Sequence, residues 1–357
     1  MSHKYVLLKE VCEKASSNIA QKDLAECDGI YPIYGASGYI KSVDFFQQAK
    51  DYIAIVKDGA GIGRAMKLPA KSSVIGTMQY VLPKDNINIS YLYYAICSMH
   101  LEKYFSGATI PHIYFRDYQN EQLPLPTLEE QAKIANVFGR IDYFIKKEKE
   151  QLINLDKLVK SRFIEMFGDL VCNPFNWEKE KLGNVLVVQP QNGIYKPQSE
   201  YVNEGGHPIL RIDGFYHGKV LSFSDLKRLR CSKQELDKYG LRSNDIVINR
   251  VNSIEYLGKS AVIDGLIEPT VFESNMMRMH PDEHIINSKF MVIQLLSKFM
   301  YNQILRHAKK AVNQASINQK DVQDFDILLP PIELQNSFVN LLTQVDKSKF
   351  VVTAKFQ

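Results

Sequence analysis

Residues 123 to 131 read Leu-Pro-Leu-Pro-Thr-Leu-Glu-Glu-Gln, and residues 328 to 335 read Leu-Leu-Pro-Pro-Ile-Glu-Leu-Gln. Each stretch opens a segment whose apolar residues fall at helical spacing. Ten identities recur at one constant offset of 204 residues: Leu101/Leu305, Ile113/Ile317, Asp117/Asp321, Gln119/Gln323, Leu125/Leu329, Pro126/Pro330, Glu129/Glu333, Gln131/Gln335, Asn136/Asn340 and Asp142/Asp346. Solenoid repeats are roughly 20 to 50 residues long, so the repeated unit here is a whole domain followed by a helix.

Length and composition agree with a duplicated, ordinary globular protein. The chain has 357 residues, 45% hydrophobic and 24% charged, which fits two domains of usual size. The net charge of +4 is compatible with an acidic partner but does not demand one.

Cysteines and hydropathy indicate the compartment. The five cysteines are scattered and never form Cys-x-x-Cys, which predicts free thiols in a reducing cytoplasm and neither a disulfide framework nor a zinc site. The first ten residues lack the apolar core of a signal peptide, and no window approaches the roughly 18 apolar residues of a membrane span. We therefore expect a cytoplasmic protein without a membrane partner.

Two mixed α/β (α+β) domains are predicted in tandem, at residues 1–125 and 170–329. In the first domain, alternating apolar runs predict strands at 51–57 and 79–82, followed by a helix at 90–105. The second domain repeats this order, with strands at 208–212 and 245–249 and a helix at 288–309.

A long amphipathic helix is predicted within the central segment, residues 126–169. Its apolar stripe, from Ile134 to Met166, runs at steps of three, four or seven, and Thr127 with Glu130 forms a capping box at its start. As one helix, residues 129–167 would be roughly 60 Å long. A stripe of that length needs a second helix to cover it.

The last segment, residues 330–357, supplies a matching stripe that starts at Phe338. The two helices are expected to form an antiparallel coiled coil, which gives the chain a pseudo-twofold internal repeat. The alternative is that each helix packs only on its own domain. The second helix has at most about 25 residues and Pro331 replaces the capping Thr127, so we expect incomplete pairing.

The motifs that could carry catalysis are incomplete. The glycine-rich segment 57–64 follows a strand, but Met-Lys-Leu-Pro follows it where a dinucleotide fingerprint needs a helix, so it is interpreted as a loop joining two strands. Asn173-Pro174-Phe175 resembles the Asn-Pro-Pro-Phe loop of adenine methyltransferases, but it lacks one proline and no cofactor loop precedes it. The histidines show no metal-ligand spacing. The sequence therefore predicts no catalytic site, no metal and no cofactor in this chain.

Polar and basic residues in glycine-bearing loops are the candidate DNA contacts. Arg, Asn and Gln can pair bidentately with base edges, while Lys and Tyr suit phosphates, although such residues also populate ordinary loops. The candidates are Tyr34, Ser37, Lys57, Arg64, Thr77, Gln79, His112 and Arg116 in the first half, and Arg211, Tyr216, Lys219, Asn249, Arg250, Asn252, Asn275, Lys309, Lys310, Asn313 and Gln314 in the second.

The duplicated proline-rich element that opens a coiled-coil helix after a variable domain resembles the specificity subunit of type I restriction-modification enzymes. The resemblance spans essentially the whole chain. Tyr-Pro-Ile-Tyr-Gly at 31–35 and Asp-Gly-Ala-Gly-Ile-Gly at 58–63 look like that family's target recognition domain, as do Trp177, residues 206–211 and residues 245–250 in the second half.

The resemblance implies that each domain reads one half of a bipartite site in double-stranded DNA. The helices would space the two halves and dock two methyltransferase subunits, which hold S-adenosylmethionine, while motor-nuclease restriction subunits join to cut unmodified DNA. The short terminal helix departs from the family's full distal spacer. The residues expected at the methyltransferase interface are Phe138, Ile141, Ile145, Leu342 and Val345.

The sequence thus favours a non-catalytic DNA-recognition subunit over two alternatives. One is a stand-alone adenine DNA methyltransferase with fused recognition domains, which binding of S-adenosylmethionine by the isolated chain would support. The other is a coiled-coil adaptor that does not contact DNA.

Overall fold

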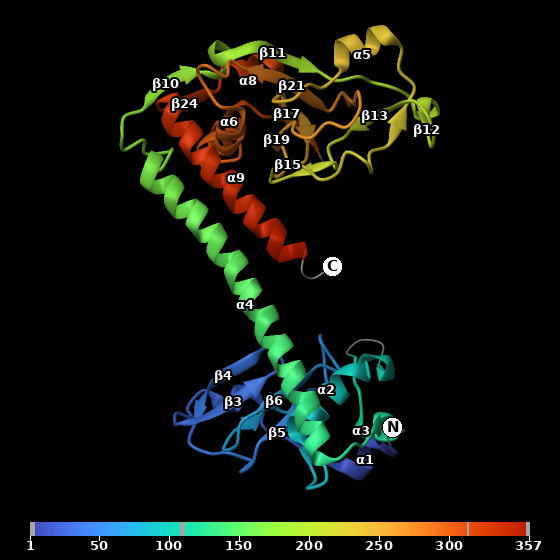
Figure 1. Ribbon diagram of the computed structural model, residues 1–357. Helices are drawn as coiled ribbons and strands as arrows, with labels where there is room; N and C mark the ends of the chain where they lie inside the picture. The colour runs from blue at the N-terminus through green and yellow to red at the C-terminus, as the bar shows by residue number, and fades with distance from the viewer. Residues whose placement is uncertain (1–3, 108–110, 313, 355–357) are drawn as a thin grey trace. The chain divides into compact units, whose positions relative to one another are not determined.

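The computed structural model describes residues 4–107, 111–312 and 314–354. It divides into two compact units, Met1–Glu148 and Lys149–Gln357 (Figure 1). The boundary falls inside one continuous helix, α4 (Leu128–Phe167), so each unit contains a mixed α/β domain and part of this helix.

Unit 1 is built on a four-stranded sheet of order β2-β8-β5-β6, beside a three-stranded sheet β4-β3-β7 and a pair β1-β9. The strands are β1 Tyr5–Leu7, β2 Cys12–Ser16, β3 Tyr31–Gly35, β4 Gly38–Val43, β5 Tyr52–Val56, β6 Ala65–Leu68, β7 Ser73–Val74, β8 Met78–Pro83 and β9 Gln122–Pro124. The helices are α1 Leu8–Val11, α2 Ile89–Ser98 and α3 Phe115–Tyr118, with 3-10 turns η1 Gln21–Leu24 and η2 Leu101–Tyr104.

The central strand β5 explains why this sheet forms. All five of its residues, Tyr-Ile-Ala-Ile-Val, are buried, because the strand lies between β8 and β6 with both faces covered. The glycine-rich segment joins β5 to β6 as an antiparallel pair, as predicted, and Val56 N donates to Arg64 O at 2.9 Å. Gly63 in this loop has φ +80°, and a Cβ there would lie 2.6 Å from Glu102 N, so only glycine fits.

Unit 2 contains a six-stranded sheet of order β11-β21-β17-β19-β15-β14, a four-stranded sheet β12-β16-β13-β20, a three-stranded sheet β18-β23-β22 and a pair β10-β24. The strands are β10 Glu178–Lys181, β11 Leu186–Asn192, β12 Tyr201–Val202, β13 His207–Leu210, β14 Phe215–Tyr216, β15 Gly218–Val220, β16 Arg228–Leu229, β17 Ile246–Asn249, β18 Val251–Asn252, β19 Ser260–Val262, β20 Val271–Phe272, β21 Met276–Pro281, β22 Lys309–Lys310, β23 Ala315–Ser316 and β24 Asp326–Leu329. The helices are α5 Lys233–Tyr239, α6 Ser288–Leu295, α7 Lys298–His307, α8 Gln319–Gln323 and α9 Ile332–Ala354, with 3-10 turns η3 Leu182–Val185 and η4 Gln198–Glu200.

Two predicted helices are shorter than expected. The segment 90–105 breaks after α2, where His100 takes a left-handed conformation with φ +52°. The segment 288–309 is two helices, because Ser297 caps a new one by accepting from Met300 N at 3.3 Å.

A copied glutamine confirms the internal repeat. Gln131 Oε1 accepts from Asn88 N at 2.7 Å, and its Nε2 donates to Pro126 O at 2.9 Å. Gln335 makes the same two bonds in unit 2, to Asn287 N at 3.0 Å and Pro330 O at 2.7 Å. Asn88 and Asn287 cap α2 and α6 respectively, so each glutamine connects a domain helix to the start of the long helix that follows.

The sheet registers repeat in the same way. Val56 pairs with Met78 between β5 and β8, and Asn249 pairs with Met276 between β17 and β21. The approach of the neighbouring strand, β6 or β19, also matches. Gly63 N donates to Val56 O at 2.9 Å, and Gly258 N donates to Asn249 O at 3.0 Å. Positions in the loops of one unit can therefore be matched to positions in the other.

The two predicted long helices, α4 and α9, and the capping box of α4 are confirmed. Thr127 N donates to Glu130 Oε2 at 3.0 Å, and Glu130 N donates to Thr127 Oγ1 at 3.3 Å at the start of α4. In unit 2, the rings of Phe163 and Phe338 lie 5.4 Å apart, and Asp156 forms an ion pair with Lys349. Phe163 follows Asp156 whereas Phe338 precedes Lys349, so the end of α4 and helix α9 pack antiparallel.

Candidate nucleic-acid interface

In unit 1, the loop after β5 gathers several of the predicted DNA contacts. Lys57 N and Asp58 N both donate to Thr77 O, at 3.0 and 3.2 Å. Asp58 Oδ1 lies 2.6 Å from His112 Nδ1, and Lys57 Nζ lies 3.8 Å from the other carboxylate oxygen. Three segments that are distant in sequence thus meet around Asp58.

The tip of the β3–β4 hairpin joins the same cluster. The guanidinium of Arg64 donates to Ala36 O, next to the exposed Ser37, and Ile75 N donates to Tyr34 O at 3.0 Å. The ring of His112 stacks on that of Tyr114, and the Arg116 guanidinium lies 4.7 Å from the Tyr114 ring centroid. The loops of unit 1 thus bring together two arginine side chains, Arg64 and Arg116, and the rings of His112 and Tyr114.

Unit 2 builds an equivalent site around Arg250. Arg250 N donates to Asn275 O at 2.9 Å, as Lys57 N does to Thr77 O, and its side chain donates through Nη1 to Ser274 O at 3.1 Å. Its Nε is buried without a hydrogen-bond partner among the described residues. Asn275 itself is exposed.

A hairpin flanks this loop. Asn252 lies opposite Ala315, which in turn pairs with Lys310, so β18, β23 and β22 form one small sheet. Lys309, Lys310 and Gln314 are exposed on it, and residues 310–312, 314 and 315 face 253–255 across a groove of about 240 Å³. Asn313, also predicted to contact DNA, lies outside the described residues.

The loop after β13 completes the unit 2 site. Arg211 Nη1 donates to the Tyr201 hydroxyl at 3.4 Å, and its guanidinium lies 5.9 Å from that ring. Tyr216 is 38% exposed, and Lys259 Nζ lies 3.9 Å from its ring centroid. The sequence reasoning missed Lys259. Leu257-Gly258-Lys259 repeats the apolar-glycine-basic pattern of Ile62-Gly63-Arg64, and this signal could have found it.

Two of the predicted DNA contacts have buried side chains. Gln79 is 2% exposed within β8, and Asn249 is 0% exposed at the end of β17. Asn249 Nδ2 donates to Tyr256 O at 3.4 Å, so this side chain connects the end of β17 to the loop that follows. Both residues have a side-chain polar atom without a hydrogen-bond partner among the described residues: Gln79 Nε2 and Asn249 Oδ1.

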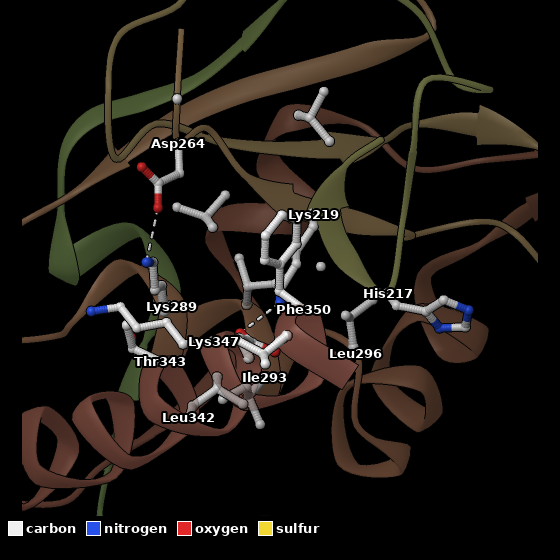
Figure 2. A pocket seen from close by; sticks show the side chains of 17 residues that line it. His217, Lys219, Asp264, Lys289, Ile293, Leu296, Leu342, Thr343, Lys347 and Phe350 are labelled. Atoms are coloured by element: carbon white, nitrogen blue, oxygen red, sulfur yellow. Dashed lines mark hydrogen bonds and ion pairs between the residues drawn. The ribbon is translucent and has the colours of Figure 1, made fainter. Parts of the chain in front are cut away.

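Lys219 lies apart from the other candidates. Its Nζ is 2.6 Å from Asp346 of α9, in a pocket of about 660 Å³ between β15, α6 and α9 (Figure 2). The wall is mostly apolar and includes Ile293, Leu342 and Phe350, while Lys289 and Asp264 form a second ion pair at 2.9 Å. Lys219 therefore pairs with a carboxylate of the copied helix instead of projecting freely toward a phosphate.

The predicted partner-interface residues differ in accessibility. Phe138 and Ile141 are each 45% exposed on α4 in unit 1, and the Phe138 ring lies 5.0 Å from Tyr94. Ile145 and Leu342 are half-buried. Val345 is 4% exposed, so it is a packing residue of unit 2 and offers little surface to a partner.

Sequence comparison places the chain in a known family. A match to the family described as "Type I restriction modification DNA specificity domain" covers residues 3–156 and 174–355. The putative type I restriction enzyme MjaX specificity subunit of Methanocaldococcus jannaschii is 33% identical over 48% of this chain and 40% of its own length. The MjaIX specificity subunit of the same organism is 26% identical over 73% of this chain and 63% of its own length. The matched regions thus span less than two thirds of these two relatives.

The fold is also similar to solved structures. The type I restriction-modification S subunit from M. genitalium superposes with a TM-score of 0.66 at 15% identity, covering 99% of this chain and 92% of the other. A chain from a study of type I complex assembly gives a TM-score of 0.54 at 16% identity. Within the described ranges, no helix combines the length and apolar character that a membrane crossing requires. The duplicated fold and the two-part sequence match together show that this chain belongs to the type I restriction-modification DNA specificity family.

Proposed function

We propose that this chain is the DNA sequence-recognition subunit of a type I restriction-modification complex and that each unit reads one half of a bipartite site. One observation carries the proposal: a duplicated scaffold presents different polar side chains at equivalent loop positions. Lys57 N in unit 1 and Arg250 N in unit 2 donate to equivalent carbonyls, Thr77 O and Asn275 O, directly before β8 and β21. Two readers that share a framework but differ in their loops suit a split, asymmetric DNA sequence.

The chemistry of the loops fits this role. Arginine can pair bidentately with guanine, and asparagine with adenine, whereas lysine is suited to phosphate. Each mismatched base pair costs a DNA-binding protein roughly 1 to 3 kcal/mol, so one small module discriminates only a short sequence. Two modules on one chain multiply that discrimination.

Catalysis is assigned to partners in this proposal. Two methyltransferase subunits, which would hold S-adenosylmethionine, would modify adenine, and restriction subunits would cut unmodified DNA. The motifs that point to catalysis in this chain are incomplete, which favours a non-catalytic subunit. The cytoplasmic location expected from the cysteines stays a prediction.

The exposed apolar face of α4 supports a partner-docking role for the helices. Val137, Phe138, Ile141 and Phe144 of unit 1 are each at least 45% exposed. Large exposed apolar patches on soluble proteins often mark protein–protein interaction sites. We expect Phe138→Asp and Ile145→Asp to weaken co-purification with the methyltransferase, whereas Val187→Asp, at a 67% exposed apolar residue of β11, should not. Unchanged co-purification of both helix variants, with the fold intact, would remove the basis for this interface.

The decisive experiment for the proposed function maps modified adenines in cells that carry this chain and its methyltransferase. The expected result is one motif with two defined halves and an undefined gap. Gel-shift titration at stated salt, with the partner present, separates this function from that of an adaptor without DNA contact. Methylation by the isolated chain, with bound S-adenosylmethionine, would instead indicate a stand-alone methyltransferase.

A further inference from the structure

The main chain of Ile212 is held by side chains on both sides. Ile212 N donates to Glu273 Oε1 at 2.5 Å, and Ile212 O accepts from Lys259 Nζ at 2.5 Å. Ile212 lies in the loop between β13 and β14, directly after Arg211 and four residues before Tyr216. The two bonds therefore fix the loop that carries two candidate DNA contacts.

Lys259 is built into an aromatic enclosure. Its Nζ lies 4.7 Å from the Phe215 ring centroid, 3.9 Å from that of Tyr216 and 5.9 Å from that of Tyr256. Burial lowers the pKa of Lys259, and the nearby Asp213 acts in the opposite direction. Attraction between the ammonium and the ring faces offsets part of the cost of removing this charge from water. The enclosure also joins the 253–258 loop, which follows Arg250, to the loop that carries Arg211.

Glu273 on the opposite side is also buried, at 8% exposed. Burial raises its pKa, while the hydrogen bond from Ile212 N and the charge of Arg211 lower it. Burying a carboxylate costs free energy unless the carboxylate is hydrogen-bonded. The hydrogen bond from Ile212 N therefore offsets part of the cost of burying Glu273. Glu273 and Lys259 thus form a clamp on one peptide segment.

Unit 1 has an equivalent of the Lys259 contact but not of the Glu273 contact. Arg64 O accepts from Val56 N, and Lys259 O accepts from Asn249 N, so the two basic residues are equivalent. Likewise, Ile75 N donates to Tyr34 O and Glu273 N donates to Leu210 O, which makes Ala36 the counterpart of Ile212. The Arg64 side chain donates to Ala36 O, but Ile75 occupies the place of Glu273, and its aliphatic side chain cannot accept a hydrogen bond.

We propose that Lys259 and Glu273, and Arg64 in unit 1, are positioning residues that set the sequence specificity of each half-site. They act by holding the β3–β4 or β13–β14 loop in a fixed position against the loop after β5 or β17. Base discrimination requires donors held to within a fraction of an ångström, so loosening the clamp lets the same side chains reach incorrect bases. This inference rests on the proposed function.

The test uses the full chain assembled with its methyltransferase and measures methylation rates on duplexes with single-base changes in each half-site. Lys259→Met and Glu273→Leu should reduce discrimination at one half-site by about tenfold, within the usual cost of one mismatch, and leave the other half-site unchanged. Lys259→Arg, which copies Arg64, and Glu273→Gln, which keeps an acceptor, should restore discrimination. Arg64→Met should relax the other half-site.

Three results would overturn the clamp. They are unchanged discrimination in the Met and Leu variants, equal loss of rate on all duplexes, and relaxation of the same half-site by Lys259→Met and Arg64→Met. If Lys259→Met does not fold, Arg64→Met and Lys259→Arg still decide the question. A wild-type complex without sequence-specific methylation contradicts the proposed function itself, whereas a specific wild type with unaffected variants contradicts only the clamp.

Discussion

The two units keep the same framework but fill equivalent interior positions with different chemistry. Gln131 and Gln335 make matching hydrogen bonds, whereas unit 1 has Val56, Ile75 and Tyr80 where unit 2 has Asn249, Glu273 and Arg278. The duplicated units therefore share the side chains that hydrogen-bond to the main chain and stabilise the framework, and they differ in the side chains next to the loops.

The polar interior of unit 2 needs partners that unit 1 lacks. Burial lowers the pKa of Arg278, and its guanidinium donates to Gly240 O at 2.5 Å and to Gln191 Oε1 at 2.7 Å. Gly240 directly follows α5, a helix without a counterpart between β4 and β5 of unit 1. The larger unit therefore stabilises charges that the smaller one replaces with apolar residues and tyrosine.

The largest expected effect distinguishes the two long helices. Phe338 is 1% exposed and contacts Phe163 and Phe167, so Phe338→Ala should lower the free energy of unfolding of unit 2 by about 3 to 5 kcal/mol. Its counterpart Ile134 is only half-buried, so Ile134→Ala should cost unit 1 about 1 to 2 kcal/mol.

Trp177, the only tryptophan, makes this measurement specific to unit 2, because its Nε1 donates to Phe167 O at 3.0 Å. Denaturant titration by tryptophan fluorescence follows unit 2, and amide exchange follows unit 1. Phe350→Ala, at a 75% exposed position of α9, is the control. Equal losses for Phe338→Ala and Phe350→Ala would contradict the packing of α4 against α9.

The copied glutamines should give a smaller and more symmetric effect. Gln131→Ala and Gln335→Ala each leave buried main-chain groups without a partner, which should cost about 2 to 3 kcal/mol in the corresponding unit. Gln151→Ala, at an exposed position of α4, should change stability by less than about 0.5 kcal/mol. A loss confined to one unit would show that the two hydrogen-bonded connections are not energetically equivalent.

The next effect concerns base reading. Arg250→Ala should weaken binding by about 1 to 3 kcal/mol and relax one position of one half-site. Lys57→Ala, at the equivalent place in unit 1, should affect only the other half-site. Binding titrations on single-base variants of the site check this. A sequence-independent loss for Arg250→Ala would assign it to phosphate instead.

The smallest effect is expected at the β22–β23 hairpin. Lys309→Ala together with Lys310→Ala should weaken binding to all sequences alike and reduce the salt slope by about 2, because each lysine releases roughly one counterion. Lys157→Ala, exposed on α4, serves as the control. A change in sequence preference without a change in slope would contradict a phosphate role for the lysine pair.

The framework could be predicted from sequence because it follows periodic rules. The helical stripe, the Thr127–Glu130 capping box and the copied glutamines appear in the structure as expected. The loops could not be predicted, since Asn249 and Gln79 look like base readers in sequence but are buried by strand register. The apolar-glycine-basic pattern marks the position of Lys259, but its contacts with three rings and a carbonyl are brought together only by folding.

Independent reading by the two units is the central claim, and domain replacement tests it most directly. Residues 1–122 are replaced with the equivalent domain of a relative, and modified adenines are mapped in cells that carry the hybrid and the methyltransferase. The account predicts that one half-site changes while the other half-site stays the same. A change in both halves, or in neither, from an active hybrid would contradict it.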